Sequence, residues 1–432
     1  MTTGSRDGGS VTRRKLGAAA LAGALCAPVL AACGSSTSSG PATLNWYIGH
    51  QAGGWIENAA AVCNKNSGGK YTIKVQDLPA TASDQREQLV RRLAAKDSSI
   101  DLIGMDVIWT AEFANAGWIK AFPDSMRGAL TDGVLQGPVA TVQYGGKIYA
   151  APFTSNTQLL WYRSDLVPAP GNDFTWKQMI DQAVAKKLKV QMTGIKAESL
   201  SVTFNAVLAS AGGHFLTDPG KGQNAAVSLD PGPTTQALTV LHDLATSPAA
   251  DASLSNNDED GTRQAFEKGG AAYQLNYPFI YPSAKENQGQ AFQDKIKWAR
   301  YPEVVAGQKS RPPLGGFNIG VGNYTQHADL AYQAAQCIVG KDNQRFAAIN
   351  GGNPPTRSDL YDDADLVKVY PFAKVLRESI NDAEPRPVSP AYNDLSLAVQ
   401  DTLHPLSTIS PQSSAKKLRT LVQQALKSEA VL

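Results

Sequence analysis

Residues 151–163 read Ala-Pro-Phe-Thr-Ser-Asn-Thr-Gln-Leu-Leu-Trp-Tyr-Arg, and this stretch divides the chain into two parts. Before it, short apolar runs alternate with helical patterns as far as a Gly-Gly turn at 145–146. After it, an apolar and aromatic run reads as a strand and leads into new helical patterns. A segment that leaves one α/β lobe and enters another is a hinge about which two lobes close on a ligand. We therefore predict a hinge crossing here, with Asn156 facing the cleft; an ordinary buried strand is the alternative.

The composition is that of a globular protein with a sizeable core. The chain has 432 residues, of which 42% are apolar and 18% are charged. This length corresponds to about two or three domains. The formal net charge is +2, and no basic residues cluster as a nucleic-acid-binding face requires. We therefore expect no nucleic-acid partner.

The N-terminus has the pattern of an export signal. Positive charges at 13–15 precede an apolar run at 16–30, which is too short to span a membrane. The order Leu-Ala-Ala-Cys ending at Cys33 resembles the lipobox of bacterial lipoproteins, and a plain secretory signal is the alternative. We predict a signal peptide over 1–32, an acylated Cys33 and a flexible Gly/Ser-rich tether over 33–43. The protein is then anchored by lipid to the outer side of the cytoplasmic membrane.

Two further cysteines, Cys63 and Cys337, each fall at apolar positions of a helical pattern. Disulfides persist outside the cytoplasm, so the two thiols have the opportunity to pair. Two separate buried thiols are the alternative, and we favour a bridge.

Strands and helices alternate along most of the chain. The third strand pattern, at 100–105, ends on Asp106, and ligands of open α/β sheets bind beyond the carboxyl ends of strands. Thr81 with Asp84 three residues later predicts a helix start. Pro313 to Ile319 reads as a glycine turn that enters a strand. The other expected strands are 44–48, 71–75, 272–277 and 295–301, and the helices after the hinge include 175–187, 202–212 and 234–246.

Motifs of catalysis and metal binding are missing from the sequence. It has no HExxH, no CxxC, no P-loop and no G-x-S-x-G motif. We therefore expect a binding protein without cofactor or metal. Carboxylate, amide and guanidinium groups together suit a neutral polyol, and aromatic rings cover the apolar face of a sugar. The residues left for such a cleft are Asp106, Glu112, Asn156, Glu259, Tyr277 and Arg386.

Two of these interpretations have ordinary alternatives. Trp109, Phe113 and Trp118 suit core packing of a short helix better than ligand stacking. Arg386, between two prolines, is equally compatible with a solvated loop.

Four stretches, at 106–114, 156–163, 343–345 and 382–387, carry a resemblance to a known family. The chain resembles the extracellular solute-binding proteins of ABC sugar importers, of the maltose-binding type. Within that family it is similar to the trehalose-binding lipoproteins of mycobacteria. The resemblance implies an α/β, two-lobe periplasmic-binding-protein fold with hinge crossings and an interlobe ligand cleft. We expect lobe 1 to comprise 44–152 and 306–353, and lobe 2 to comprise 153–305 and 354–432.

The resemblance also implies which residues bind the ligand. The ligand set that it implies is Asp106, Asn156, Glu259, Tyr277, Gly315, Gly316 and Arg386. Apart from the resemblance, we also expect Gln51, in the loop after the first strand, to contact the ligand. Cys63 and Cys337 match a cysteine pair of the mycobacterial proteins, which strengthens the disulfide prediction. Those proteins carry Trp where this chain has Tyr277, and the stretch from Asn276 to Gly315 is shorter here. These departures leave the identity of the sugar open.

The implied function is that of a lipid-anchored, monomeric receptor that closes on a disaccharide, and trehalose is the first candidate. It would deliver the sugar to two permease subunits powered by a cytoplasmic ATPase. One alternative is the same fold with maltose or another sugar as ligand. The other is an extracellular glycoside hydrolase that uses Asp106 and Glu259, which requires the two carboxyl groups to lie about 5–9.5 Å apart across the ligand.

Overall fold

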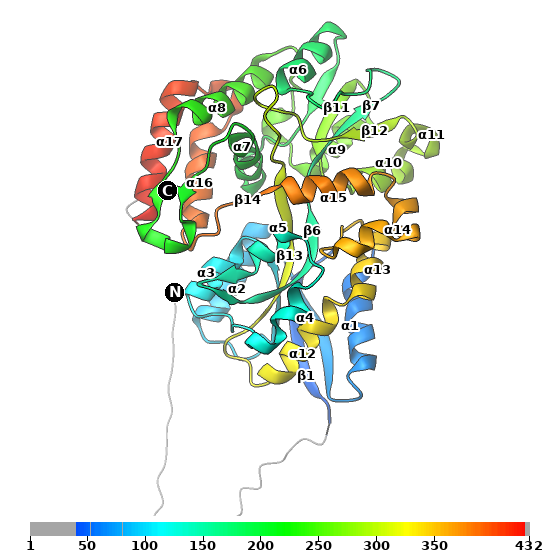
Figure 1. Ribbon diagram of the computed structural model, residues 1–432, viewed down its shortest axis with the longest axis vertical. Coiled ribbons are helices and arrows are strands. Elements are labelled where there is room, and N and C mark those ends of the chain that lie inside the picture. The colour runs from blue at the N-terminus through cyan, green and yellow to red at the C-terminus, as the bar shows by residue number, and fades with distance from the viewer. Residues whose placement is uncertain (1–39, 52, 80, 428–432) are drawn as a thin grey trace, which may run out of the picture. The chain divides into compact units, whose positions relative to one another are not determined.

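The computed structural model describes residues 40–51, 53–79 and 81–427, so the predicted signal peptide and Cys33 lie outside the described residues. Two sheets organise residues 41–427 (Figure 1). The six-stranded sheet has the order β14-β13-β3-β1-β2, with β6 also paired to β13. Its strands are β1 (Ala42–Gly49), β2 (Tyr71–Leu78), β3 (Leu102–Asp106), β6 (Ala150–Asn156), β13 (Pro313–Val321) and β14 (Glu384–Pro385).

The six-stranded sheet combines parallel and antiparallel pairs. β1 pairs with β2 and β3 in parallel, whereas β13 runs antiparallel to β3 and β6. Apolar side chains of the sheet and its helices form one core cluster that includes Trp46, Leu89 and Phe153. The helices in this part of the chain are α1 (Trp55–Asn66), α2 (Ala82–Ala94), α3 (Trp109–Asn115), α4 (Arg127–Thr131), α5 (Gln136–Thr141), α12 (Ala328–Ile338) and α13 (Lys341–Gly351).

The second sheet has four strands in the order β12-β7-β11-β8. Every residue of β7 is buried, because its alternate side chains enter two different cores. Leu160 and Tyr162 belong to one cluster, and Leu159 and Trp161 belong to another. The strands are β7 (Leu159–Arg163), β8 (Lys189–Gln191), β11 (Ala271–Asn276) and β12 (Ile296–Ala299).

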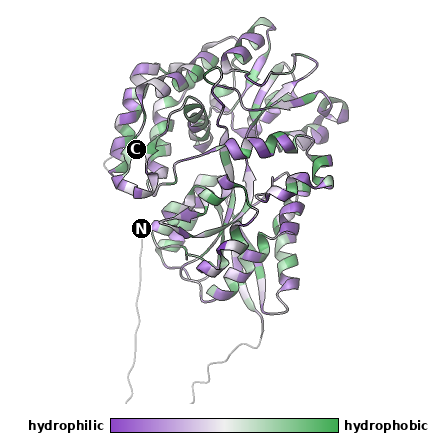
Figure 2. Cartoon of the chain, in the orientation of Figure 1, coloured by the Kyte–Doolittle hydropathy of each residue, from purple (hydrophilic) through white to green (hydrophobic). Residues whose placement is uncertain are grey.

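Helices cover both faces of this sheet and continue to the end of the chain. Figure 2 shows hydrophilic and hydrophobic residues alternating along the peripheral helices. The last helix follows the predicted stripe, since Leu418, Val422 and Ala425 are buried. The helices are α6 (Trp176–Ala185), α7 (Glu198–Ser210), α8 (Pro231–Thr246), α9 (Glu259–Glu267), α10 (Ile280–Gln288), α11 (Gln290–Gln293), α14 (Ala364–Val369), α15 (Ala373–Asp382), α16 (Tyr392–Leu403) and α17 (Pro411–Leu426). Short elements complete the set: β4 (Gln143–Tyr144), β5 (Lys147–Ile148), β9 (Leu216–Thr217), β10 (Ala226–Val227), η1 (Asp124–Met126), η2 (Pro219–Asn224), η3 (Leu254–Asn256), η4 (Ser358–Asp362) and η5 (Leu406–Thr408).

The predicted hinge crossing at 151–163 is confirmed. β6 belongs to the six-stranded sheet and β7 to the four-stranded sheet, with only Thr157 and Gln158 between them. The short strand β14 is added to the six-stranded sheet through Pro313 and Leu314, after α15 and shortly before α16. The limits of the two lobes, as given in the sequence analysis, stay a prediction.

The glycine turn expected before β13 is wrong. Gly315 and Gly316 lie inside β13, opposite Asn156 and Ser155 of β6. Gly316 has φ +130°, and a Cβ there would come within 2.1 Å of the Thr154 carbonyl oxygen. Glycine is required at 316 because the two backbones approach too closely for a side chain. In the sequence, a glycine needed for close strand packing looks the same as a glycine needed for a turn.

Most predicted elements are present with shifted ends. Thr81 caps α2 as predicted, since its hydroxyl accepts a hydrogen bond from the Asp84 amide. α7 begins at Glu198, four residues before the predicted start at 202. Almost all of this helix is buried, and Ala197 before it gives no side-chain cap. The sequence therefore lacks the N-cap residue that most clearly marks a helix start, and only Glu198 in the first turn indicates one.

Cys63 of α1 and Cys337 of α12 form a disulfide, as predicted, across 274 positions of sequence. The bond ties together two helices that pack against each other. Among the residues that the structure describes, no helix is both long and apolar enough to cross a bilayer.

Candidate functional site

A cavity of about 580 Å³ lies between the ends of β3, β6 and β13 and the N-terminal ends of α7 and α9. This volume falls within the range of small-molecule sites. Seven of the eight predicted ligand residues line it; Gln51, in the loop between β1 and α1, does not. The lining residues are Thr81, Ala82, Ser83, Asp106, Asn156, Ile195, Ala197, Glu198, Ser199, Val202, Asp258, Glu259, Tyr277, Gly315, Gly316, Phe317 and Arg386.

Asp106 is the last residue of β3, and one oxygen of its carboxylate bonds to the protein while the other stays free of described partners. Its Oδ1 accepts hydrogen bonds from the Ile108 amide at 3.1 Å and from Arg386 Nη2 at 2.7 Å. Its Oδ2 accepts no hydrogen bond from any described residue. This second oxygen is available to a hydroxyl group of a ligand.

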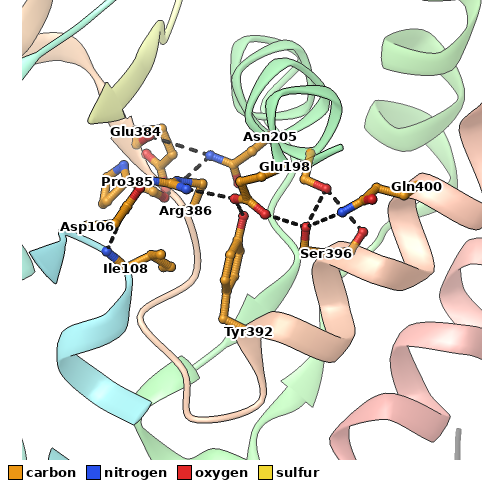
Figure 3. A network of polar contacts seen from close by, with 11 residues as sticks. Asp106, Ile108, Glu198, Asn205, Glu384, Pro385, Arg386, Tyr392, Ser396 and Gln400 are labelled. Carbon is orange, nitrogen blue, oxygen red and sulfur yellow. Dashed lines mark hydrogen bonds and ion pairs between the residues drawn. The ribbon is translucent and has the colours of Figure 1, made fainter. Parts of the chain in front are cut away.

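Arg386 follows β14 directly and is only 4% exposed, so the solvated-loop alternative is excluded. Its other arm, Nη1, donates to Glu198 Oε1 at 2.7 Å, so one guanidinium joins two carboxylates (Figure 3). Its Nε is buried without a hydrogen-bond partner among the described residues.

Glu198, the first residue of α7, was missed by sequence analysis. Its carboxylate also accepts hydrogen bonds from the hydroxyls of Tyr392 and Ser396, both on α16 (Figure 3). The available signal was an acidic residue just before an apolar helical run. The helix was predicted to start at 202, so Glu198 fell outside the predicted element.

The charged groups shift each other's pKa. Burial by itself lowers the pKa of Arg386, but Asp106, Tyr392 and Glu198 outweigh burial and raise that pKa well above its usual range. Burial raises the pKa of Glu259, and the negative charges of Asp258 and Glu198 add to the effect. Glu259 forms no ion pair with any described residue. Its carboxyl group is therefore less compensated by cations than those of Asp106 and Glu198, which pair with Arg386.

Asn276, at the end of β11, positions two of the predicted ligand residues. Its side chain is fully buried; Nδ2 donates to the Glu259 carbonyl at 2.9 Å, and Oδ1 accepts from the Tyr277 amide at 2.8 Å. Asn156 on β6 accepts a hydrogen bond at Oδ1 from the Thr157 backbone amide at 3.0 Å. Its side-chain nitrogen, Nδ2, bonds to no described residue. Asn156 thus offers a donor, and Tyr277 and Phe317 offer aromatic surface.

Glu112 lines a smaller adjoining cavity of about 30 Å³, which shares Asp106, Glu198 and Arg386 with the larger one. There its Oε2 accepts a hydrogen bond from Arg86 Nε at 2.8 Å. Glu112 therefore lies beside the main cavity but does not line it, because α3 turns its carboxylate toward α2, and its contact with a ligand stays a prediction. Trp109 and Phe113 are buried and Trp118 packs against the same core, as predicted.

The chain matches the sequence pattern of the bacterial extracellular solute-binding proteins over residues 50–345. It belongs to this family. A member of the family binds a solute and is not an enzyme, so the glycoside hydrolase alternative is set aside.

Individual proteins are also similar to this solute-binding protein. A probable ABC transporter-binding protein of Deinococcus radiodurans is 25% identical over 371 residues, which cover 82% of this chain and 86% of that protein. The maltose-bound MalE3 of T. maritima has a TM-score of 0.78 and 22% identity, and the match covers 88% of this chain and 99% of that one. The GacH receptor of Streptomyces glaucescens has a TM-score of 0.76 and 20% identity, and the match covers 90% of this chain and 100% of that one. These two likenesses establish the two-lobe fold.

Proposed function

We propose that this protein is the lipid-anchored substrate-binding component of an ABC sugar importer and that it captures a disaccharide. The observation that carries the proposal is the convergence of seven predicted ligand residues on one cavity of about 580 Å³. The family and the Deinococcus relative support the role in transport. On this proposal, hinge closure traps the sugar, and the protein delivers it to two permease subunits driven by a cytoplasmic ATPase.

The groups that the cavity offers support a neutral sugar. Asp106 Oδ2 and Glu259 offer acceptors, Asn156 offers an amide donor, and Tyr277 offers an aromatic face with a hydroxyl. Hydroxyl groups donate and accept, so a polyol can satisfy both kinds of partner at once. A purely apolar ligand would leave these groups desolvated without partners, which is costly.

We propose trehalose as the first candidate, on the resemblance to the mycobacterial trehalose-binding lipoproteins. Maltose is the second candidate, because the T. maritima neighbour was solved with maltose bound. Tyr277 is the residue at which this chain departs from the mycobacterial pattern, so it is where discrimination between sugars would change.

Calorimetric titration of the mature chain without its lipid, against trehalose, maltose, sucrose and glucose, tests the proposal. We expect one disaccharide to bind at a ratio of one per chain and to be recovered intact after long incubation. Absence of binding to every sugar in an enlarged panel would contradict the proposed ligand class. Binding of maltose but not trehalose would move the assignment to the second candidate.

A further inference from the structure

We infer that Glu198 is a positioning residue of the binding site, which acts on the ligand through Arg386 and Asp106. This inference rests on the proposed function, since it concerns how the same cavity binds its sugar. Glu198 is absent from the ligand set that the family resemblance implies, and the structure alone brings it to the site.

Glu198 connects α7 to the segment that follows β14. Oε1 accepts from Arg386 Nη1 at 2.7 Å and from the Tyr392 hydroxyl, and Oε2 accepts from the Ser396 hydroxyl at 2.5 Å. Ser396 is held in turn by Ser201, one turn along α7, at 2.7 Å. Both oxygens of Glu198 are therefore fixed by groups of the protein itself, which distinguishes Glu198 from the half-engaged Asp106.

The guanidinium of Arg386 connects the fixed Glu198 carboxylate to Asp106. It is planar, and its donors form a rigid fork, so fixing Nη1 on Glu198 also sets the direction of Nη2. Nη2 reaches Asp106 Oδ1 at 2.7 Å, and that contact keeps Oδ2 free for the ligand. The stack of Arg386 on Tyr392, with the guanidinium carbon 5.7 Å from the ring centre, limits rotation about the fork.

The two anchors come from different parts of the fold. Asp106 ends a strand of the six-stranded sheet, whereas Glu198 starts a helix whose side chains pack into the core beside the four-stranded sheet. Arg386 therefore fixes the position of the Asp106 carboxylate relative to the start of α7. Charge is needed for this, because bonds of an ionised pair are about twice as strong as neutral ones.

A double-mutant cycle tests the inference. The binding of trehalose, or of whichever panel sugar the wild type binds, is measured by calorimetry for Glu198→Gln, Arg386→Lys and the double variant. We expect Glu198→Gln to weaken affinity by roughly tenfold or more. In the Arg386→Lys background the same change should cost much less, because a residue that acts through Arg386 has no further effect once the fork is lost. Equal losses in both backgrounds would overturn the inference.

Glu267→Gln is the matched control. Glu267 is buried on α9, pairs with Arg263 at 2.6 Å and accepts from the Ser283 hydroxyl, but it does not line the cavity. We expect it to lower the melting temperature and to leave sugar affinity unchanged. If Glu198→Gln behaves in the same way, its role is only structural and the inference is wrong.

Tyr392→Phe decides the case in which Glu198→Gln does not fold. It removes one hydrogen bond to Glu198 and keeps the Arg386 charge, so it should weaken affinity in the wild-type background and not in Arg386→Lys. Equal effects of Tyr392→Phe in the two backgrounds would again overturn the inference. A wild type that binds no sugar overturns the proposed function together with the inference, whereas unchanged affinity in Glu198→Gln and Tyr392→Phe overturns the inference alone.

Discussion

Arg386 Nη2 lies 2.7 Å from Asp106 Oδ1, although the two residues are 280 positions apart in the sequence. Asp106 ends β3, and Arg386 follows β14, which the six-stranded sheet holds two strands away. The pair shows how a crossing segment from the second half of the chain completes a site begun in the first.

Asp106→Ala should weaken sugar binding without unfolding the protein. Loss of a charged hydrogen-bond partner costs about 1.5–3 kcal/mol, which is roughly a tenfold to hundredfold loss of affinity. Calorimetry measures the affinity, and far-UV circular dichroism should stay unchanged. Asp165→Ala is the control, since Asp165 pairs with Arg163 at 2.7 Å outside the cavity. Equal affinities of wild type and Asp106→Ala would contradict the assignment of Asp106 to the ligand.

Glu259 should make the ligand-free protein less stable as the pH rises. Its folded pKa lies above the ordinary Glu value, chiefly because of burial, so the folded protein binds this proton more tightly than the unfolded chain. The stability it contributes is full below about pH 4.3 and is lost as the pH rises through the folded pKa. Glu259→Gln removes this term. Denaturant unfolding of both proteins over a pH series should give curves that diverge with rising pH, and parallel curves would contradict the raised pKa.

Gly316→Ala should impair folding, whereas Gly315→Ala should impair sugar binding. A Cβ at 316 meets the Thr154 carbonyl oxygen at 2.1 Å, so Gly316→Ala should sharply lower the melting temperature or prevent folding. At 315 the nearest atoms lie at 3.9 Å, from Asn156 and Tyr277, so Gly315→Ala should fold normally. Its methyl group enters the cavity and should weaken sugar binding. Normal folding of Gly316→Ala would mean that the strands do not approach as closely as described.

Loss of the Cys63–Cys337 bridge should lower stability by up to roughly 5 kcal/mol, on chain-entropy grounds, because it closes a loop of 274 residues. Measured values usually fall short of that bound. Denaturant unfolding of the Cys63→Ser/Cys337→Ser variant gives the loss. Thiol labelling of the unreduced, denatured mature wild type should find no free sulfhydryl, and one or more per chain would rule the bridge out.

Cys33→Ala should release the protein from the membrane fraction, because Cys33 is the predicted acylation site. Cys26→Ala is the control, since Cys26 lies within the predicted signal peptide and should leave membrane association intact. Fractionation followed by immunoblotting measures the outcome. A Cys33→Ala protein that stays in the membrane fraction with unchanged mobility would contradict the lipoprotein prediction.

The sequence by itself determined the alternating sheets and helices and the crossing at 151–163, and with the family resemblance it indicated seven of the seventeen residues around the cavity. It did so where local chemistry is decisive. The apolar and aromatic residues 159–162 of β7 favour burial on both faces, Asp106 ends β3 at the cavity, and Thr81 caps α2. The ligand residues followed from the family resemblance rather than from these patterns.

Only the tertiary structure decided which charged groups share the site. Glu198 and Glu112 are both acidic residues in the first turn of a helix, yet Glu198 accepts a hydrogen bond from Arg386 and Glu112 accepts one from Arg86. The direction of each side chain is set by how its helix packs, which depends on contacts between residues far apart in the chain. For the same reason, the glycines at 315 and 316 were predicted to form a turn. The structure places them inside a strand, where the Thr154 carbonyl of the neighbouring strand leaves no room for a side chain at 316.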